Sequence, residues 1–152
     1  MQVPVEIKLK TVQTQAGEIE KFELLEQGEL TCKGETIYLR YTEAKAGAQT
    51  ILKIKSAELL LTRRQGQLAL QLNLVEGQQT NAKYKTAYGI ISLVAKCTTY
   101  KYEPLTETSG ELKVEYLLYS GEELLGEYRS NAIQNIVELK EIVNKLQKYS
   151  FY

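Results

Sequence analysis

The chain has 152 residues, 43% hydrophobic and 25% charged, and its 19 Lys and Arg balance 19 acidic residues. These values are typical of one globular domain that buries most of its unfolded surface. The sequence has no His, no Trp and no Asp, which excludes Ser-His-Asp and Cys-His catalysis, aspartate dyads and EF-hand calcium loops.

Four strands are predicted in the first third of the chain, over residues 3–12, 19–30, 36–43 and 50–55. Each shows alternation of apolar and polar residues or is rich in β-branched and aromatic residues. Residues 19–30 also contain many Glu and Leu, which are good helix formers, but the short connections around them favour a strand. In residues 36–43, Tyr41 and Glu43 share a face with Ile37 and Leu39.

Residues 58–75 are predicted to form a hairpin with Gly66 in its turn. A loop of Gln65 and Gly66 pairs Arg63 with Leu68 and turns Arg63 toward the apolar face. A loop that also includes Arg64 shifts the pairing by one residue and turns Arg64 inward instead. The first loop gives the cleaner apolar face and is favoured.

Residues 83–102 are predicted to form one long strand, bent at Gly89, with Tyr84, Thr86 and Tyr88 on one face. Two further strands are predicted over residues 111–119 and 122–128. A glycine bend is how antiparallel sheets curl into barrels. About nine strands joined by short polar turns predict an all-β fold, an antiparallel barrel similar to a calycin or lipocalin, over residues 1–130.

The last part of the chain changes character. Residues 131–148 have apolar residues at helical spacing, and Asn131 with Gln134 has the pattern of a capping pair. This predicts a C-terminal amphipathic helix packed on the same single domain. A helix that docks a partner is the alternative.

The two cysteines, Cys32 and Cys97, lie 65 positions apart, which is not the spacing of a zinc site or of a disulfide scaffold. We interpret them as buried apolar side chains and predict no metal and no cofactor. The chain begins with an alternating strand in place of an apolar signal core and has no apolar run long enough to span a membrane. A cytoplasmic location is expected.

Several short motifs occur in a characteristic order: Tyr38-Leu39-Arg40-Tyr41-Thr42-Glu43, Arg64-Gln65-Gly66, Tyr84-Lys85-Thr86-Ala87-Tyr88-Gly89, Thr98 and Gly110-Glu111-Leu112. Over residues 5–128 the chain therefore resembles the YwiB-like family of small bacterial β-barrel proteins. The resemblance implies a calycin-like barrel and carries no catalytic residues. It also implies a chain that finishes in a strand, so the stretch beyond Arg129 departs from the family pattern.

A barrel of this size encloses either packed side chains or one small ligand. Four tyrosines and one threonine are predicted to face the lumen: Tyr41, Tyr84, Tyr88, Tyr116 and Thr86. Buried phenols need hydrogen-bond partners, so these residues either line a polar cavity or satisfy one another in a filled core.

Glu43 and one of Arg63 and Arg64 are predicted to meet at the barrel mouth. Such a pair often only orders the structure. The alternative is that Arg63 or Arg64 anchors a ligand carboxylate or phosphate through its planar guanidinium.

The sequence therefore favours a barrel that binds a small amphipathic or anionic molecule. The alternative is an interaction or regulatory module with a filled barrel, acting as a homodimer or with a protein partner. No enzyme is expected, because no pair of Glu residues has catalytic spacing. Nucleic-acid binding is unlikely for a neutral chain with balanced halves; Lys83, Lys85, Lys96 and Lys101 could form a local basic face but are more simply solvated lysines.

Overall fold

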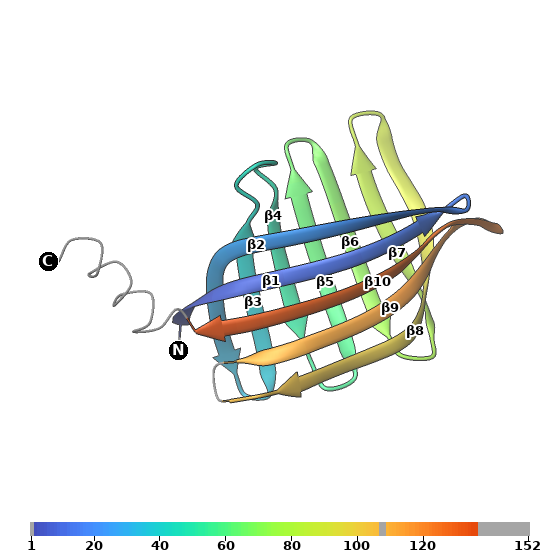
Figure 1. Ribbon diagram of the computed structural model, residues 1–152. Helices are drawn as coiled ribbons and strands as arrows, with labels where there is room; N and C mark the ends of the chain where they lie inside the picture. Colours follow the sequence, from blue (N-terminus) through green and yellow to red (C-terminus); the bar gives the residue numbers. More distant parts are fainter. Residues whose placement is uncertain (1, 107–108, 137–152) are drawn as a thin grey trace, which may run out of the picture.

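The computed structural model describes residues 2–106 and 109–136, and every regular element in this part of the chain is a β-strand (Figure 1). The strands are β1 (Gln2–Gln15), β2 (Glu18–Lys33), β3 (Thr36–Thr42), β4 (Gln49–Ile54), β5 (Glu58–Gln65), β6 (Leu68–Val75), β7 (Gln79–Thr86), β8 (Gly89–Pro104), β9 (Gly110–Ser120) and β10 (Glu123–Ile136).

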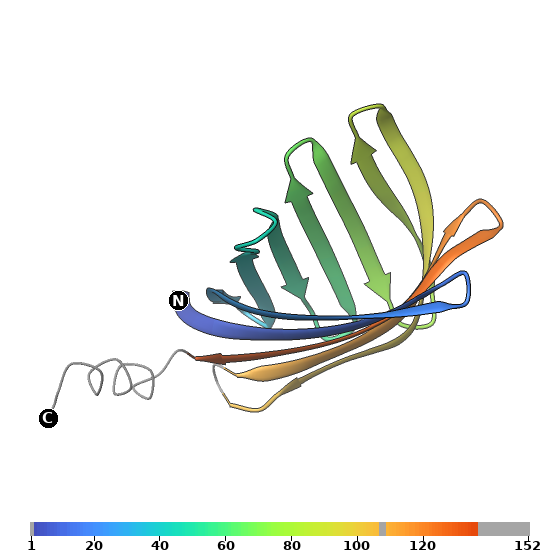
Figure 2. The same ribbon diagram turned by 45° about the horizontal axis from the view of Figure 1, so that its top comes forward.

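The ten strands form a closed antiparallel barrel in which each strand pairs with its neighbours in sequence and β1 pairs with β10. The prediction of an all-β antiparallel barrel is confirmed, with ten strands where about nine were expected. Figures 1 and 2 show the long strands β1, β8, β9 and β10 running across one side, while the shorter strands β3–β7 cross them at a steep angle. The long strand β2 passes from the first group to the second.

The extra strand comes from the stretch around Gly89, where the prediction of one bent strand was wrong. Residues 79–86 and 89–104 are two strands of a hairpin, paired from Thr86 with Gly89 down to Gln79 with Lys96. Gly89 has a φ of 132°, which other residues rarely adopt. The Thr86 hydroxyl donates to the Gly89 carbonyl and accepts from the Tyr88 amide, and both bonds stabilise the tight turn.

The hairpin of β5 and β6 turns one residue later than predicted. Its loop is Gly66-Gln67, so Arg63 pairs with Leu70 and not with Leu68. A register shift of two residues preserves the inner and outer faces of a strand. For this reason Arg63 still faces inward, as predicted, and Arg64 faces outward.

The predicted helix over residues 131–148 is wrong at its start. Residues 131–136 continue β10 and pair with both β1 and β9, from Asn131 opposite Lys10 to Ile136 opposite Val5. Unpaired edges of β1 and β9 would otherwise be exposed, so ladder formation outweighs a weak capping pattern. The barrel therefore extends beyond residue 130, and the rest of the predicted helix lies outside the described residues.

The barrel core consists of inward-facing aliphatic side chains. The largest of those that are fully buried come from six of the ten strands: Val5, Ile7, Leu30, Leu39, Ile54, Leu59, Leu72 and Leu74. They occupy alternate positions in each strand, as the two-residue period of a pleated strand requires. Three of them, Leu59, Leu72 and Leu74, also line the cavity described below.

Gly28 allows β2 to pass between the two groups of strands. A Cβ atom at this position would collide with the Arg40 carbonyl oxygen and would lie 2.9 Å from Ile7 Cδ1. Tyr41, the cross-strand partner of Gly28, lies at the same point. The close approach of β1, β2 and β3 here therefore requires glycine.

We expect Gly28→Ala to lower the free energy of unfolding by about 3 kcal/mol, because the new methyl group collides with backbone as well as side-chain atoms. The thermal midpoint should fall by roughly 10 °C. Denaturant and thermal unfolding measure both values. Gln27→Ala, at an exposed position of the same strand, is the control and should change little. Equal stability of Gly28→Ala and the parent chain would contradict the close approach.

Candidate functional site

A cavity of about 200 Å³ lies inside the barrel, between the inner faces of seven strands. Eight of the side chains that line it are leucines, and seven carry polar groups. The full set is Leu9, Thr11, Tyr41, Glu43, Thr50, Leu52, Leu59, Leu61, Arg63, Leu70, Leu72, Leu74, Leu112, Val114, Tyr116, Ser130 and Ala132. The lumen is thus mainly apolar, with a small number of polar groups.

The first group of polar side chains is a row across three neighbouring strands. Tyr41 of β3 lies opposite Thr50 of β4, and Thr50 lies opposite Arg63 of β5. Directly opposed residues have Cβ atoms about 5 Å apart on the same face of the sheet. The pairing register therefore brings a phenol, a hydroxyl and a guanidinium together inside the barrel.

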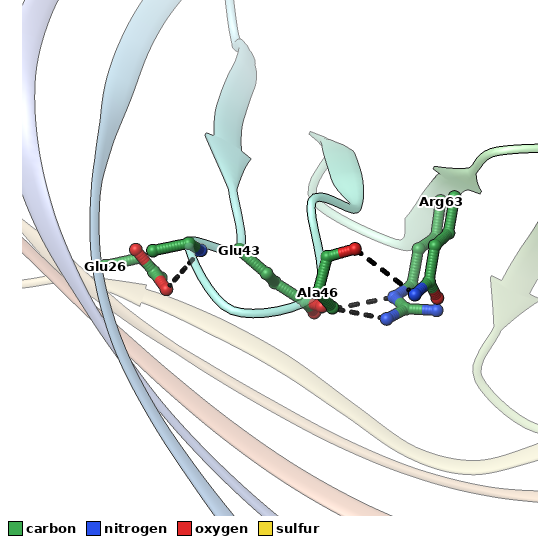
Figure 3. A network of polar contacts seen from close by, with 6 residues as sticks. Glu26, Glu43, Ala46 and Arg63 are labelled. Carbon is green, nitrogen blue, oxygen red and sulfur yellow. Dashed lines mark hydrogen bonds and ion pairs between the residues drawn. The ribbon is translucent and has the colours of Figure 1, made fainter.

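Arg63 forms an ion pair with Glu43. Its Nη2 donates to Glu43 Oε2 at 2.8 Å and its Nε donates to Oε1 at 3.4 Å, which is a bidentate arrangement (Figure 3). The hydrogen bond to this carboxylate raises the pKa of Arg63 above its usual value. The Arg63 side chain is 37% exposed and that of Glu43 is 17% exposed, so the pair lies where the lumen reaches solvent. The predicted meeting of Glu43 and Arg63 is confirmed.

The loop that carries Glu43 is held from both sides. Glu26 of β2 accepts a hydrogen bond from the Ala44 amide at 2.9 Å, and Gln65 of β5 donates to the Ala46 carbonyl at 3.2 Å (Figure 3). Within the loop, the Glu43 backbone amide donates a hydrogen bond to the Ala48 carbonyl oxygen at 2.8 Å. These bonds fix the position of the carboxylate that orients Arg63. Sequence reasoning missed Glu26 and Gln65, because their partners are backbone atoms of a loop.

Thr50 carries an unsatisfied hydroxyl. Its side chain is 2% exposed, and Oγ1 has no hydrogen-bond partner among the described residues. Burial raises the pKa of the neighbouring Tyr41 phenol, and the nearby Thr50 hydroxyl offsets part of that rise. The two hydroxyl groups nevertheless do not reach hydrogen-bond geometry. An unpaired buried hydroxyl costs about 1–3 kcal/mol and is uncommon in native proteins.

The opposite wall of the lumen carries a second polar group. Tyr116 of β9 stacks on Tyr128 of β10, with ring centroids 5.0 Å apart and planes inclined by 12°. Burial raises the pKa of Tyr116, and the nearby Tyr128 adds to the rise. Beside them the Thr11 and Ser130 hydroxyls are hydrogen-bonded to each other at 3.2 Å. Unlike Thr50, these two hydroxyls are satisfied within the protein.

The structure brings together half of the residues predicted for the site. Tyr41, Glu43, Arg63 and Tyr116 line the cavity, and Tyr84 lies on the inner face but packs against the core outside it. The other three lie elsewhere: Arg64 is exposed on the outer face, Thr86 bonds the β7–β8 turn, and Tyr88 is fully exposed at its tip.

The misplacement of Thr86 and Tyr88 follows from the hairpin at Gly89, which takes both residues out of the lumen. Thr50 was missed, although a signal was available. It shares strand parity with Leu52 and Ile54 in a predicted strand, and both of these are buried. A threonine on the apolar face of a strand is a candidate lumen hydroxyl.

The rim of the lumen carries exposed apolar side chains that face inward by register. Phe22 lies opposite Thr11 and is 50% exposed, and Ile91 lies opposite Tyr84 and is 48% exposed. Leu68, on the same face as Leu70, is 38% exposed. These three side chains extend the apolar lining out to the mouth.

Among the described residues, no three Cys and Glu side chains come close enough to hold a metal ion. Cys32 and Cys97 are both free thiols, and burial raises the pKa of Cys97. In the same part of the chain, no helix is long and apolar enough to cross a membrane.

Comparison with known proteins finds a family match and a relative of the same fold. Residues 7–131 match the model of a domain of unknown function (DUF1934). The chain is 27% identical, over 124 residues, to the uncharacterized beta-barrel protein YwiB of Bacillus subtilis (strain 168), which covers 80% of this chain and 86% of that protein. The crystal structure of the ywiB protein from Bacillus subtilis matches with a TM-score of 0.78 at 24% identity, over 90% of this chain and 94% of that one. The resemblance predicted from the motifs is confirmed.

The buried phenols predict a loss of stability in alkali. Burial raises the pKa of Tyr41, Tyr100, Tyr116 and Tyr128 above 10.0, so the folded chain keeps protons that the unfolded chain releases above pH 10. The stability that these neutral phenols provide is complete below pH 10. It falls as the pH rises further, by up to about 1.4 kcal/mol per pH unit for each retained proton.

Ultraviolet titration of phenolate together with unfolding at each pH tests this expectation. The four phenols should ionise only as the chain unfolds. Tyr116→Phe should reduce the loss of stability above pH 10, whereas Tyr88→Phe, at a fully exposed position, should not. Reversible ionisation of all 11 tyrosines in the folded chain would contradict the burial.

Proposed function

The chain belongs to the DUF1934 family, and from the structure of its lumen we propose that the barrel binds a small amphipathic molecule whose polar head accepts hydrogen bonds. The observation that carries the proposal is the unpaired Thr50 hydroxyl, buried in a cavity beside Arg63. A native protein rarely retains such a group without a partner. A ligand atom at this point would satisfy it.

The chemistry of the row defines the head group. Arg63 uses Nε and Nη2 for Glu43, which leaves the two N–H groups of Nη1 as donors. The Thr50 and Tyr41 hydroxyls can also donate, so the row offers several donors and needs an acceptor. A carbonyl or a carboxylate meets this need. Because Glu43 already balances the charge of Arg63, a single carboxylate is the largest negative charge that the site accommodates well.

The remaining lumen defines the rest of the ligand. Leu59, Leu61 and Leu72 line it next to the polar row, and burial of apolar surface against them contributes about 25 cal/mol per Å². The volume of about 200 Å³ is below the usual range for drug-sized ligands, roughly 300–1,000 Å³. The ligand is therefore small, or its apolar end extends to the rim, where Phe22 and Ile91 face inward.

The alternative is a ligand-free barrel that acts through its outer surface. In that case the cavity holds only water, about six molecules at roughly 30 Å³ each. A water molecule in an apolar cavity needs two to four polar partners. Among the lining residues, such partners lie along the Tyr41–Thr50–Arg63 row with Glu43, and on the opposite wall at Thr11, Tyr116 and Ser130. Most of the leucine-lined volume is therefore better suited to an apolar group than to water.

Native mass spectrometry of protein purified gently from its own organism tests the proposal directly. We expect a native mass above the denatured mass by the mass of one small organic molecule, which solvent extraction then identifies. Octanoate, a short-chain carboxylate, serves as the probe if the ligand is lost in purification. A bare chain mass together with no binding of octanoate would leave the ligand-free alternative.

Two neighbouring arginines provide a matched pair of variants. We expect Glu43→Gln/Arg63→Leu to fold and to bind octanoate at least about tenfold more weakly, because a hydrogen bond to a charged group contributes about 1.5–3 kcal/mol. The double change avoids leaving an unpaired carboxylate. Arg64→Leu removes the same type of side chain from the outer face and should leave octanoate affinity unchanged. If the two variants bound octanoate with equal affinity, Arg63 would have no role in binding the head group.

Thr50→Val separates binding from stability. The isosteric change removes the unpaired hydroxyl, so the ligand-free protein should become more stable, by about 1 kcal/mol, while octanoate affinity decreases. Isothermal calorimetry and denaturant unfolding measure the two effects. Thr62→Val, on the outer face of the next strand, is the control and should change neither. A loss of stability in Thr50→Val would show that the hydroxyl has a partner in the protein.

A further inference from the structure

The neutral chain has an uneven charge distribution along its length. Residues 36–98 contain nine Lys and Arg and three Glu, while the two flanking segments together contain ten Lys and Arg and sixteen Glu. Each half of the chain is balanced, because the boundary between halves divides the basic segment. Overall neutrality therefore conceals a basic region that corresponds to β3–β7 and the start of β8.

The barrel gathers these cations on one outer wall. The outer faces of β3–β7 carry Arg40, Lys53, Arg64, Lys83 and Lys85, each adjacent in sequence to an inward-facing residue. We call this set the basic wall. The acidic side chain on the same outer faces is Glu58, and it pairs with Lys55 at 3.4 Å. In Figure 1 these strands lie side by side, so the cations share one surface.

Several of the other exposed cations of the barrel are neutralised, although Lys8, Lys21 and Lys33 form no ion pair within the described residues. Ion pairs on the outer faces of the long strands join Lys10 to Glu23, Lys101 to Glu103, Lys113 to Glu111 and Arg129 to Glu115. Within the described residues, none of the five cations of the basic wall forms an ion pair, so their charges add at the surface.

A hollow of about 480 Å³ lies within the basic wall, between the β5–β6 and β7–β8 hairpins. Arg64 and Lys85 stand on its two sides, and both pair with Ala69 in the strand between them. The backbones of Arg64 and Lys85 are two strand spacings apart, about 10 Å. The small Ala69 side chain between them leaves the bottom of the hollow open. Thr86 lines the same hollow. This geometry suits a phosphate group held between two cations.

An aromatic side chain stands next to the hollow. Tyr88, at the tip of the β7–β8 hairpin, is fully exposed, and its neighbour Ala87 lines the hollow. An exposed aromatic ring beside a row of cations is the arrangement by which proteins hold single-stranded nucleic acid, with cations on the backbone and bases stacked on rings. An acidic protein surface would use the cations but would leave Tyr88 without a role.

We propose that the basic wall binds the phosphodiester backbone of single-stranded nucleic acid, with a phosphate between Arg64 and Lys85 and a base stacked on Tyr88. The site faces solvent on the opposite side of the barrel wall from the lumen, because Arg63 and Arg64 point to opposite faces of β5. Neither Arg64 nor Lys85 lines the lumen, and Leu68, at the lumen mouth, also borders the hollow.

Fluorescence anisotropy of the full chain with labelled oligouridylate and oligothymidylate of about 20 nucleotides tests the proposal, in salt from about 50 to 200 mM. The parent chain should bind, and its affinity should fall steeply with salt. Arg64→Glu/Lys85→Glu should weaken binding by at least about tenfold. It should also reduce the slope of log affinity against log salt by about 1.4, since each phosphate contact to a single strand contributes about 0.7.

Lys8→Glu/Lys21→Glu is the matched control. Both lysines are exposed on β1 and β2, neither forms an ion pair with another described residue, and the two substitutions change the net charge equally. Its affinity should stay within about twofold of that of the parent chain. Tyr88→Ala should weaken binding by about tenfold while the salt slope stays constant, since stacking does not release counterions.

Equal losses in the wall and control variants would overturn the proposal, because binding would then depend on net charge alone. The proposal would also be overturned if the chain bound neither oligonucleotide. Binding to vesicles that contain phosphatidylserine, without binding to either oligonucleotide, would indicate a membrane surface instead and would overturn it as well. Preference for oligouridylate or for oligothymidylate supports the proposal in either case, and indicates whether the 2′-hydroxyl is recognised.

Discussion

Closure of the sheet is the constraint on which the other features depend. In a closed barrel each strand has an inner and an outer face, and consecutive side chains alternate between them without exception, apart from bulges. Arg63 and Arg64 illustrate the consequence. They are neighbours in sequence, yet one is paired with Glu43 inside the barrel and the other stands on the outer wall. The role of each arginine is decided by strand parity, not by its chemistry.

Polar groups in a leucine-lined lumen are costly unless each has a partner. Most of those in this barrel are satisfied: Glu43 by Arg63, Thr11 by Ser130, and the Tyr100 hydroxyl by the Lys55 carbonyl at 2.6 Å. Thr50 differs from all of them. Since neighbouring sites in the same barrel are paired, the unpaired hydroxyl is a local property of the Tyr41–Thr50–Arg63 row and not a general looseness of the fold.

Strand parity also explains which features could be predicted from the sequence. The β5–β6 turn was misplaced by one residue, but the resulting shift of two positions kept the Arg63 side chain inside. The error at Gly89 was different, because a bend and a tight hairpin require the same residue, and only the Thr86 hydroxyl bonds distinguish them. That error removed Thr86 and Tyr88 from the predicted lumen site. Residues 131–136 were misassigned for a third reason: their strand depends on partners in β1, more than 120 residues away in sequence.

The charge distribution shows how a barrel converts a neutral sequence into a surface with distinct regions. Opposite charges within one strand or on adjacent strands of the long-strand side neutralise one another in surface pairs, each of which contributes little to stability. Unpaired cations on β3–β7 repel one another, and this repulsion lowers the stability of the folded state slightly. An anion bound on that wall relieves the repulsion, whereas an anion bound on the long-strand side would have to compete with existing ion pairs. The two proposals therefore concern different classes of molecule on the two faces of the barrel wall: a polyanion outside β3–β7 and a small amphipathic molecule in the lumen.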